Sequence, residues 1–248
     1  MIVDRYQDAY KSRWQAIANH ILPPNVFYIE HGWQGHVVRA KYAVVSRAQF
    51  VKGTSPAAFH PSLWARFSQP VALLYARDER ARNEMTAAIA EAVKTMLQAS
   101  APLVPSPASS ADLWQAALRK TYSAELRPES QERAATIYQA DAARYDRVAR
   151  LVFPDHLTDD GRIAIQATAE ESTRARRSWR WRRLLGKPLS VLRLMKSLFT
   201  FQGGVDYALW KVERHTGVRV PVSGFERRHP LLNAPRLLWR VWRLSAVR

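Results

Sequence analysis

The chain contains no cysteine. This absence excludes structural disulfides, thiolate metal sites and a cysteine nucleophile, and it is consistent with a reducing compartment. Long hydrophobic runs are also missing, since no apolar stretch approaches the roughly 18 residues that a membrane-spanning helix needs. The sequence also lacks a phosphate-binding P-loop, a G-x-G-x-x-G motif and the G-x-S-x-G elbow of serine hydrolases. If this protein meets a membrane, we expect it to lie on the surface.

Acidic residues are scarce in one region. Residues 174–248 contain 18 Lys or Arg and three acids, so their formal charge of +15 supplies most of the chain's +17. Five of the nine tryptophans lie in the same region. Interleaved cations and aromatic rings are typical of surfaces that bind anionic phospholipid, and also of surfaces that bind nucleic acid. Composition alone leaves both partners open.

Apolar periodicity and turn residues predict an α+β fold. Tyr6, Tyr10, Trp14, Ile17 and Ile21 recur at steps of three and four, which predicts a helical face. Glycine-containing turn residues separate two runs of β-formers, which predicts a hairpin. The elements expected in the first hundred residues are a helix over 4–21, strands over 25–30 and 37–46, a short buried strand over 70–76 and a helix over 78–99.

A segment rich in proline and serine, residues 101–110, predicts a linker between domains. Ser109 and Asp112 have the spacing of a capping box that opens a helix to about residue 122. A second helix is expected from Pro128 to Phe153. Because a turn at 159–161 then precedes a short strand expected over 162–168, this part predicts a small winged-helix-like module.

The basic region is expected to contain amphipathic helices. After Gly186 and Pro188, a helix is expected to run to about Phe201. Its predicted apolar face is Val191, Leu192, Met195, Leu198 and Phe199, and its predicted polar face is Ser190, Arg193, Lys196, Ser197 and Thr200. Two further helices are expected near 207–217 and 236–244. The residues predicted to contact a membrane are Arg180, Trp181, Arg193, Trp239, Arg240, Trp242 and Arg243.

Two groups of side chains could suggest metal binding. His20, His31 and His36 lack the spacing of metal ligands, so ordinary histidines are the favoured interpretation. Asp4 and Asp8 are four residues apart on the expected helix and could share a face, as carboxylates that hold Mg²⁺ must share a site. Solvated acids in the first turn of a helix explain them more simply.

Two stretches of the chain match motifs of a known family. Residues 41–46, K-Y-A-V-V-S, are similar to that family's K-Y-x-V-I-S strand. Residues 65–71, A-R-F-S-Q-P-V, are similar to its G-R-x-x-K-P-V motif, with Ala65 in place of glycine and Gln69 in place of lysine.

Two later stretches match the same family. Residues 122–127, Y-S-A-E-L-R, are similar to its Y-x-G-D-x-R motif. Residues 196–200, K-S-L-F-T, with Tyr207 and Lys211 beyond them, are similar to its K-G-I-x-T segment and trailing Y-x-x-x-K. In order and spacing, the four stretches resemble the mitochondrial-type phosphatidate cytidylyltransferases, also called the translocator assembly and maintenance family, and their bacterial relatives.

The resemblance implies a fold and a reaction. The fold would be a partial nucleotidyltransferase-like region over 1–100, a helical, winged-helix-like region over 101–173 and a basic, membrane-associating region over 174–248. The reaction would join CTP and phosphatidate into CDP-diacylglycerol and pyrophosphate with Mg²⁺ at a membrane surface. The implied catalytic residues are Lys41, Arg66, Glu125 and Arg127, and the implied substrate-binding residues are Tyr122, Lys196, Thr200, Tyr207 and Lys211.

One departure from the family affects the expected activity. The family's G-S motif and metal-binding aspartates would lie ahead of the first matched stretch, and Met1 to Asp4 is similar only to the far end of that strand. Three explanations stay open: the true start lies upstream, another chain supplies the missing half, or this chain is a non-catalytic derivative. No metal-ligand role is assigned to Asp4.

Three functional hypotheses follow from the sequence. The first is a relative of CTP:phosphatidate cytidylyltransferase at the cytoplasmic face of a membrane, bound peripherally, with Lys41, Arg66 and Arg127 in one cleft. The second is a non-enzymatic basic adaptor on anionic membranes. The third, a nucleic-acid-binding protein, is the least favoured of the three.

Overall fold

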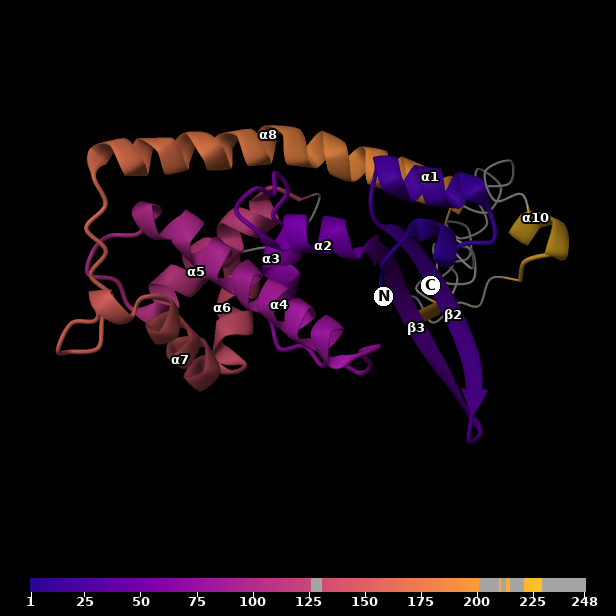
Figure 1. Ribbon diagram of the computed structural model, residues 1–248, viewed down its shortest axis with the longest axis horizontal. Helices are drawn as coiled ribbons and strands as arrows, with labels where there is room; N and C mark the ends of the chain where they lie inside the picture. The colour runs from indigo at the N-terminus through magenta and orange to yellow at the C-terminus, as the bar shows by residue number, and fades with distance from the viewer. Residues whose placement is uncertain (126–130, 201–209, 211–212, 215–220, 229–248) are drawn as a thin grey trace, which may run out of the picture. The chain divides into compact units, whose positions relative to one another are not determined.

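The computed structural model describes residues 1–125, 131–200, 210, 213–214 and 221–228. It is a mixed α+β structure (Figure 1). The chain divides into two compact units. We call Met1–Val45 with Arg193–Arg248 the hairpin unit, and Ser46–Leu192 the helical unit. The predicted α+β class is therefore confirmed, while its nucleotidyltransferase-like and winged-helix-like details stay predictions.

The hairpin unit is built on a small sheet. Its described elements are β1 (Ile2–Val3), the 3₁₀ helix η1 (Tyr6–Asp8), α1 (Arg13–Ile21), β2 (Asn25–Trp33), β3 (His36–Ser46) and α10 (Gly224–Arg228). The strand order is β1-β3-β2, and β2 and β3 pair antiparallel. Gln34 and Gly35 form the tight turn between them with φ of 47° and 78°. The predicted hairpin is thus confirmed.

The predicted helix over 4–21 is wrong in its first half. Residues 6–8 form η1 instead, where the Arg5 guanidinium pairs with the Asp8 carboxylate. Asn19 explains how α1 is oriented, because its side-chain amide donates to the Val44 carbonyl at 2.9 Å and accepts from the Asn25 amide at 2.8 Å. These buried bonds hold the side of α1 that carries Asn19 against the hairpin. The apolar residues Trp14, Ile17 and Ile21, whose spacing predicted a helical face, are exposed.

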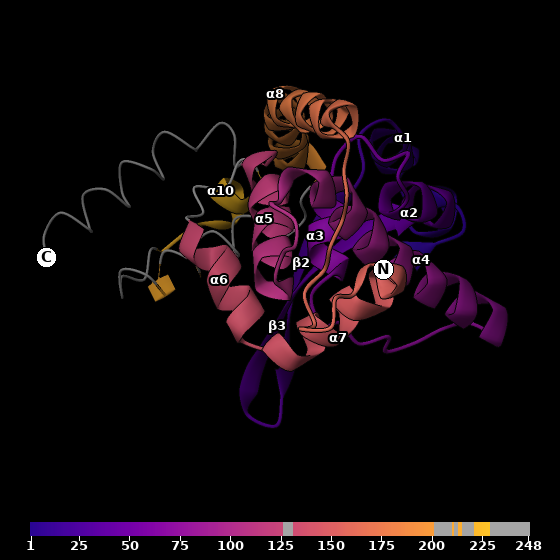
Figure 2. The same ribbon diagram turned by 90° about the vertical axis from the view of Figure 1, so that its left-hand side faces the viewer.

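The helical unit contains most of the helices that the structure describes. They are α2 (Arg47–Thr54), α3 (Ser62–Phe67), α4 (Glu79–Ser100), η2 (Ala101–Leu103), α5 (Ser110–Ser123), α6 (Gln131–Gln139), α7 (Ala142–Val152), η3 (Pro154–His156) and α8 (Ala169–Thr200) up to Leu192. Figure 2 shows α4, α5, α6 and α7 from a second side. The predicted helix over 78–99 is confirmed by α4, which Asp78 caps. The predicted capping box is also confirmed, since Ser109 and Asp112 bond reciprocally at the start of α5.

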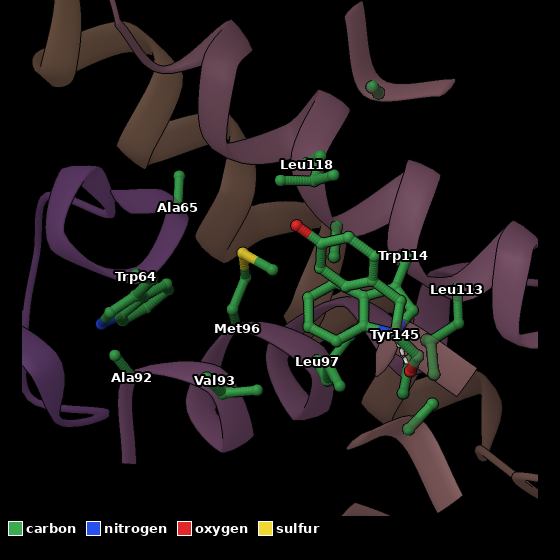
Figure 3. Packing of buried hydrophobic residues seen from close by; sticks show 14 of the residues in the cluster. Trp64, Ala65, Ala92, Val93, Met96, Leu97, Leu113, Trp114, Leu118 and Tyr145 are labelled. Atoms are coloured by element: carbon green, nitrogen blue, oxygen red, sulfur yellow. Dashed lines mark hydrogen bonds between the residues drawn. The ribbon is translucent and has the colours of Figure 1, made fainter. Parts of the chain in front are cut away.

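One hydrophobic core fills the helical unit (Figure 3). Trp64, Met96, Trp114 and Tyr145 are almost fully buried in it. The Trp114 indole donates to the Tyr145 carbonyl at 2.8 Å, and the two rings meet edge to face at 4.7 Å. Core residues come from both sides of the proline- and serine-rich segment 101–110. This segment therefore joins helices that share one core, and the three-region division of the chain stays a prediction.

Three expected elements are corrected. Residues 70–76 form no strand, and residues 70–75 are exposed rather than buried. The helix expected from 128 to 153 is two helices, because the backbone turns at Ala140 and Asp141, whose amides bond to Thr136 and Tyr138. In place of the strand expected over 162–168, the structure has isolated bridges at Ile163.

The expected break in the basic region is also wrong. α8 continues through Gly186 and Pro188 as one helix of 32 residues. Gly186 has a different reason to be glycine: a Cβ at this position would collide with the carbonyl oxygen of Ala124. Of the helix expected near 207–217 the structure describes only residues 210, 213 and 214, which are helical, and the helix expected near 236–244 lies outside the described residues.

Candidate functional site

One side of α8 packs on the core of the helical unit. Trp179 is buried, and its indole donates to the Ala99 carbonyl at 2.9 Å. Its ring meets that of Trp64 edge to face at 6.2 Å. Gly186, seven residues later and so on the same side, lies against Ala124. These contacts fix which side of α8 faces outward.

Arg182 also lies on the inner side, which the sequence analysis missed. Its guanidinium carbon is 5.0 Å from the centre of the Trp64 ring and 5.6 Å from that of Trp179. Burial lowers the pKa of this guanidinium from its ordinary value. The spacing from Trp179 to Arg182 is i,i+3, which places both on one helix side and was a usable signal. Arg182 therefore stabilises the core through cation–π contacts instead of contributing to the basic surface.

The outer side of α8 carries an apolar stripe. Within the helical unit its residues recur at steps of three and four and are all exposed: Trp181, Leu184, Leu185, Pro188, Val191 and Leu192. About half of the Trp181 surface is accessible, at 50%. A stripe of this kind normally faces a protein core. Here it faces away from the core, since the opposite side of the helix holds Trp179 and Arg182.

A row of cations runs beside this stripe. Arg176, Arg180, Arg183 and Lys187 are exposed and recur at steps of four and three. No acidic residue occurs between Ser172 and Thr200, a stretch that contains nine Lys or Arg. We call the apolar stripe and this row together the α8 surface. It joins apolar side chains with unbalanced positive charge.

The structure places only some of the predicted membrane residues. Arg180 and Trp181 belong to the α8 surface, whereas Arg193 is half-buried in the hairpin unit. Trp239, Arg240, Trp242 and Arg243 lie outside the described residues.

The last part of α8 is amphipathic, with its apolar side outward. Val191, Leu192 and Met195 are exposed. The residues of the predicted polar face that the structure describes are half-buried: Ser190, Arg193, Lys196 and Ser197.

Two of the family-like stretches meet in the helical unit. The Gln69 side chain donates to the Tyr122 hydroxyl at 3.3 Å, which links the second stretch to the third. Arg66 is exposed on α3, Tyr122 is buried on α5, and Glu125 is half-buried just after α5. Arg127 lies outside the described residues.

The other two stretches belong to the hairpin unit. Lys41 is exposed on β3, directly opposite Tyr28 of β2. The Lys196 ammonium donates to the carbonyl oxygens of Pro24, at 2.9 Å, and Leu22. Burial, with a smaller contribution from Arg193, lowers the pKa of Lys196 to about 8. Lys196 therefore contacts backbone carbonyls. The sequence predicted a substrate-binding role for it and did not predict this contact.

Convergence of the predicted catalytic cations stays a prediction. Lys41 and Arg66 belong to different units, so each is described only within its own. Among the predicted substrate-binding residues, Tyr207 and Lys211 lie outside the described residues, as does the side chain of Thr200.

The implied Mg²⁺ has no ligand set in the part of the chain that the structure describes. No three His, Asp or Glu side chains gather there in a way that could hold a metal ion. Asp4 and Asp8, which we considered as a pair, do not share a helix face because α1 begins only at Arg13.

Two cavities lie in the helical unit. One, of about 430 Å³, is lined by Pro102, Asp155, His156, Ala164, Ile165, Gln166, Ala167 and Glu171. The other, of about 340 Å³, lies between α4 and α8 beside Trp64 and Arg182. Neither is lined by Arg66, Tyr122 or Glu125.

Comparison with known proteins leaves the family open. Neither the models of known protein families nor the curated protein sequences include a match to this chain. Of the helices described by the structure, none has the length and apolar character required to span a bilayer.

Proposed function

We propose that this protein binds the surface of anionic phospholipid membranes through the α8 surface, and that it is a relative of the CTP:phosphatidate cytidylyltransferases. The observation that carries the proposal is the outward apolar stripe of α8 beside a row of four exposed cations. An amphipathic helix of this composition inserts its apolar residues at the boundary between headgroups and acyl chains, while Lys and Arg contact phosphate. Each cation near an anionic membrane contributes about 1 kcal/mol to binding.

The enzymatic part of the proposal has its own basis. It depends on the four family-like stretches and on the contact between Gln69 and Tyr122, which joins two of them. In this proposal the exposed Arg66 guanidinium neutralises charge on a nucleotide or lipid phosphate. Membrane attachment then brings the protein to the surface that contains phosphatidate.

Vesicle flotation tests the membrane part. A much larger fraction of the protein should float with vesicles of phosphatidylcholine and phosphatidate than with vesicles of phosphatidylcholine alone. Leu184→Asp and Leu185→Asp place a carboxylate in the apolar stripe and should each reduce the floated fraction severalfold. Leu151→Asp is the matched control, because Leu151 is an exposed leucine at 73% on another helix, α7. Equal losses in all three variants would overturn the assignment to α8.

A transfer assay tests the enzymatic part. Radiolabelled CTP, phosphatidate vesicles and Mg²⁺ are incubated with this chain and with a form extended upstream in its reading frame. Label should enter CDP-diacylglycerol with at least one of the two, and Arg66→Ala should reduce that transfer. No transfer by either form, with flotation intact, would refute the enzymatic part and favour the adaptor hypothesis.

Salt dependence separates the membrane from nucleic acid. Binding to DNA or RNA through phosphate contacts falls steeply as salt rises. Insertion of the apolar stripe should leave a fraction of vesicle binding at high salt. Vesicle binding that disappears together with RNA binding would count against the membrane proposal.

A further inference from the structure

An uninterrupted apolar segment is exposed in the helical unit between α3 and α4. Residues 70–76 have the sequence P-V-A-L-L-Y-A and contain no charged or hydrogen-bonding side chain apart from the Tyr75 hydroxyl. Leu74 is 93% exposed and Tyr75 is 79% exposed. Val71 and Leu73 are exposed as well. An apolar run of this length in contact with water indicates a surface that another molecule covers.

In the part of the chain that the structure describes, the backbone of this segment also lacks partners, since no hydrogen bond there involves the peptide groups of residues 71–76. Both ends of the segment are nevertheless held in place. Gln69 bonds to Ala65 and Tyr122 before it, and Asp78 caps α4 after it. The segment therefore presents unpaired N–H and C=O groups from fixed ends, which is the chemistry that an added β-strand satisfies.

Its sequence is compatible with pairing to itself. In a two-fold symmetric antiparallel pair, opposite residues point to the same side of the sheet, so one residue must lie on the axis opposite its own copy. Leu73 is the centre of the segment. Pairing about Leu73 sets Val71 opposite Tyr75, a favourable combination of a β-branched and an aromatic side chain. It also sets the small Ala72 opposite the large Leu74.

The absence of charge in the segment is also compatible with antiparallel pairing of two copies. The seven residues carry no charge, so two identical copies face one another without like-charge repulsion. The first cation after the segment, Arg77, would lie opposite Gln69 of the other copy, which is neutral.

We propose that residues 70–76 are a β-strand-addition site whose partner is the same segment of a second copy of this chain, paired antiparallel about Leu73. The proposal does not depend on the proposed membrane or enzymatic function. It gives the peptide groups of 71–76 hydrogen-bond partners and removes the leucine side chains from water.

Single cysteines can test the register, because the chain has none of its own. Leu73→Cys would face its own copy with Cα atoms about 4.5–5.5 Å apart, within the range of a disulfide. Leu74→Cys would be about 7–8 Å from its copy, across a diagonal, which is too far to bridge easily. The full-length variants are oxidised under mild conditions and the covalent dimer is quantified on non-reducing gels.

The proposal and random collision predict opposite orders for the rates at which Leu73→Cys and Leu74→Cys form dimer. We expect Leu73→Cys to form dimer several times faster than Leu74→Cys, although Leu73 is 38% exposed and Leu74 is 93% exposed. Random collision would favour the more exposed position. Faster dimer formation by Leu74→Cys, or equal rates, would overturn the proposed register.

Sedimentation of the cysteine-free protein gives an independent measurement. The wild type should show a concentration-dependent dimer, and Leu73→Pro should shift it toward monomer because proline removes a peptide N–H and blocks pairing. Arg80→Ala, an exposed change on α4, is the control and should leave the dimer unchanged. A wild type that stays monomeric at all concentrations would refute the second copy as partner.

Discussion

At the scale of single residues, Lys196 shows how a side chain can have a role that its sequence context does not reveal. Its place in a family-like stretch suggested substrate binding, but its ammonium donates to the carbonyl oxygens of Leu22 and Pro24. These partners are distant in sequence, so only the fold could show them. The contact holds the end of α8 within the hairpin unit to the segment ahead of β2.

The pKa of Lys196 predicts how stability depends on pH. Burial lowers this pKa from 10.5 to about 8, so the folded chain releases the proton at a lower pH than the unfolded chain does. Between these values the unfolded state binds more protons, and the contribution of Lys196 to the free energy of unfolding therefore rises with pH. Below pH 8 both states are protonated and the destabilisation is complete.

Comparison with Lys196→Met isolates this effect from the titration of other groups. The difference in free energy of unfolding between wild type and variant should move in favour of wild type as pH rises from 8 to 10.5. Nuclear magnetic resonance of the ¹³C-methylated lysines gives the pKa directly. A difference that is flat across this window, or titration of Lys196 near 10.5, would contradict the burial described here.

Gly186 gives a second prediction at the residue scale. In an exposed helix, Gly→Ala stabilises by about 1 kcal/mol through helix propensity. At position 186 the new Cβ would meet the Ala124 carbonyl, and the resulting displacement of packed helices costs about 1–3 kcal/mol. We therefore expect Gly186→Ala to lower the melting temperature. Gly32→Ala, where a Cβ meets no atom within 4 Å, is the control. A more stable Gly186→Ala would show that α8 does not approach Ala124.

At the scale of elements, sequence patterns correctly predicted those features that depend on interactions between residues close in sequence. The hairpin and the capping box at Ser109 were predictable because a turn or a cap involves residues close in sequence. The strand expected over 70–76 was wrong because an apolar run indicates burial but not whether a partner strand exists. The break expected in α8 was wrong because Gly186 and Pro188 resemble a helix end, whereas Gly186 serves a contact between helices.

The α8 surface, like the fold, could be predicted from the sequence only in part. Arg180 and Trp181 were expected on a basic surface and are exposed there. Arg182 was not distinguished from its neighbours, since its inward orientation depends on where Trp64 lies. The outward direction of the apolar stripe was equally hidden, because helical periodicity defines a face without saying what covers it.

Pro188 tests whether α8 is continuous. A proline inside a helix lacks the N–H for the backbone ladder and crowds the carbonyl four residues earlier, here that of Leu184, at a cost of about 3 kcal/mol. Pro188→Ala should therefore raise the free energy of unfolding by about 1–3 kcal/mol. Chemical denaturation measures the change. No gain would indicate that the helix breaks at this position, as the sequence alone suggested.

At the scale of the whole molecule, charge is concentrated instead of spread. The chain's +17 comes mostly from residues 174–248, and the α8 surface presents part of that charge beside apolar side chains. Two forces should therefore act on binding, a long-range attraction that salt weakens and an insertion that it does not. Flotation with anionic vesicles should fall between low and high salt to a nonzero plateau. Leu185→Asp should lower this plateau more than Arg183→Gln does.

The most direct test of the central claim uses a fluorophore on α8. Since the chain has no cysteine, Leu185→Cys and Leu151→Cys can each be labelled at one site with an environment-sensitive dye. If α8 lies on the membrane, vesicles containing phosphatidate should shift the emission of the dye at 185 to the blue. The dye at 151, on α7, should keep its emission. An unshifted dye at 185, or equal shifts at both positions, would contradict membrane binding through the α8 surface.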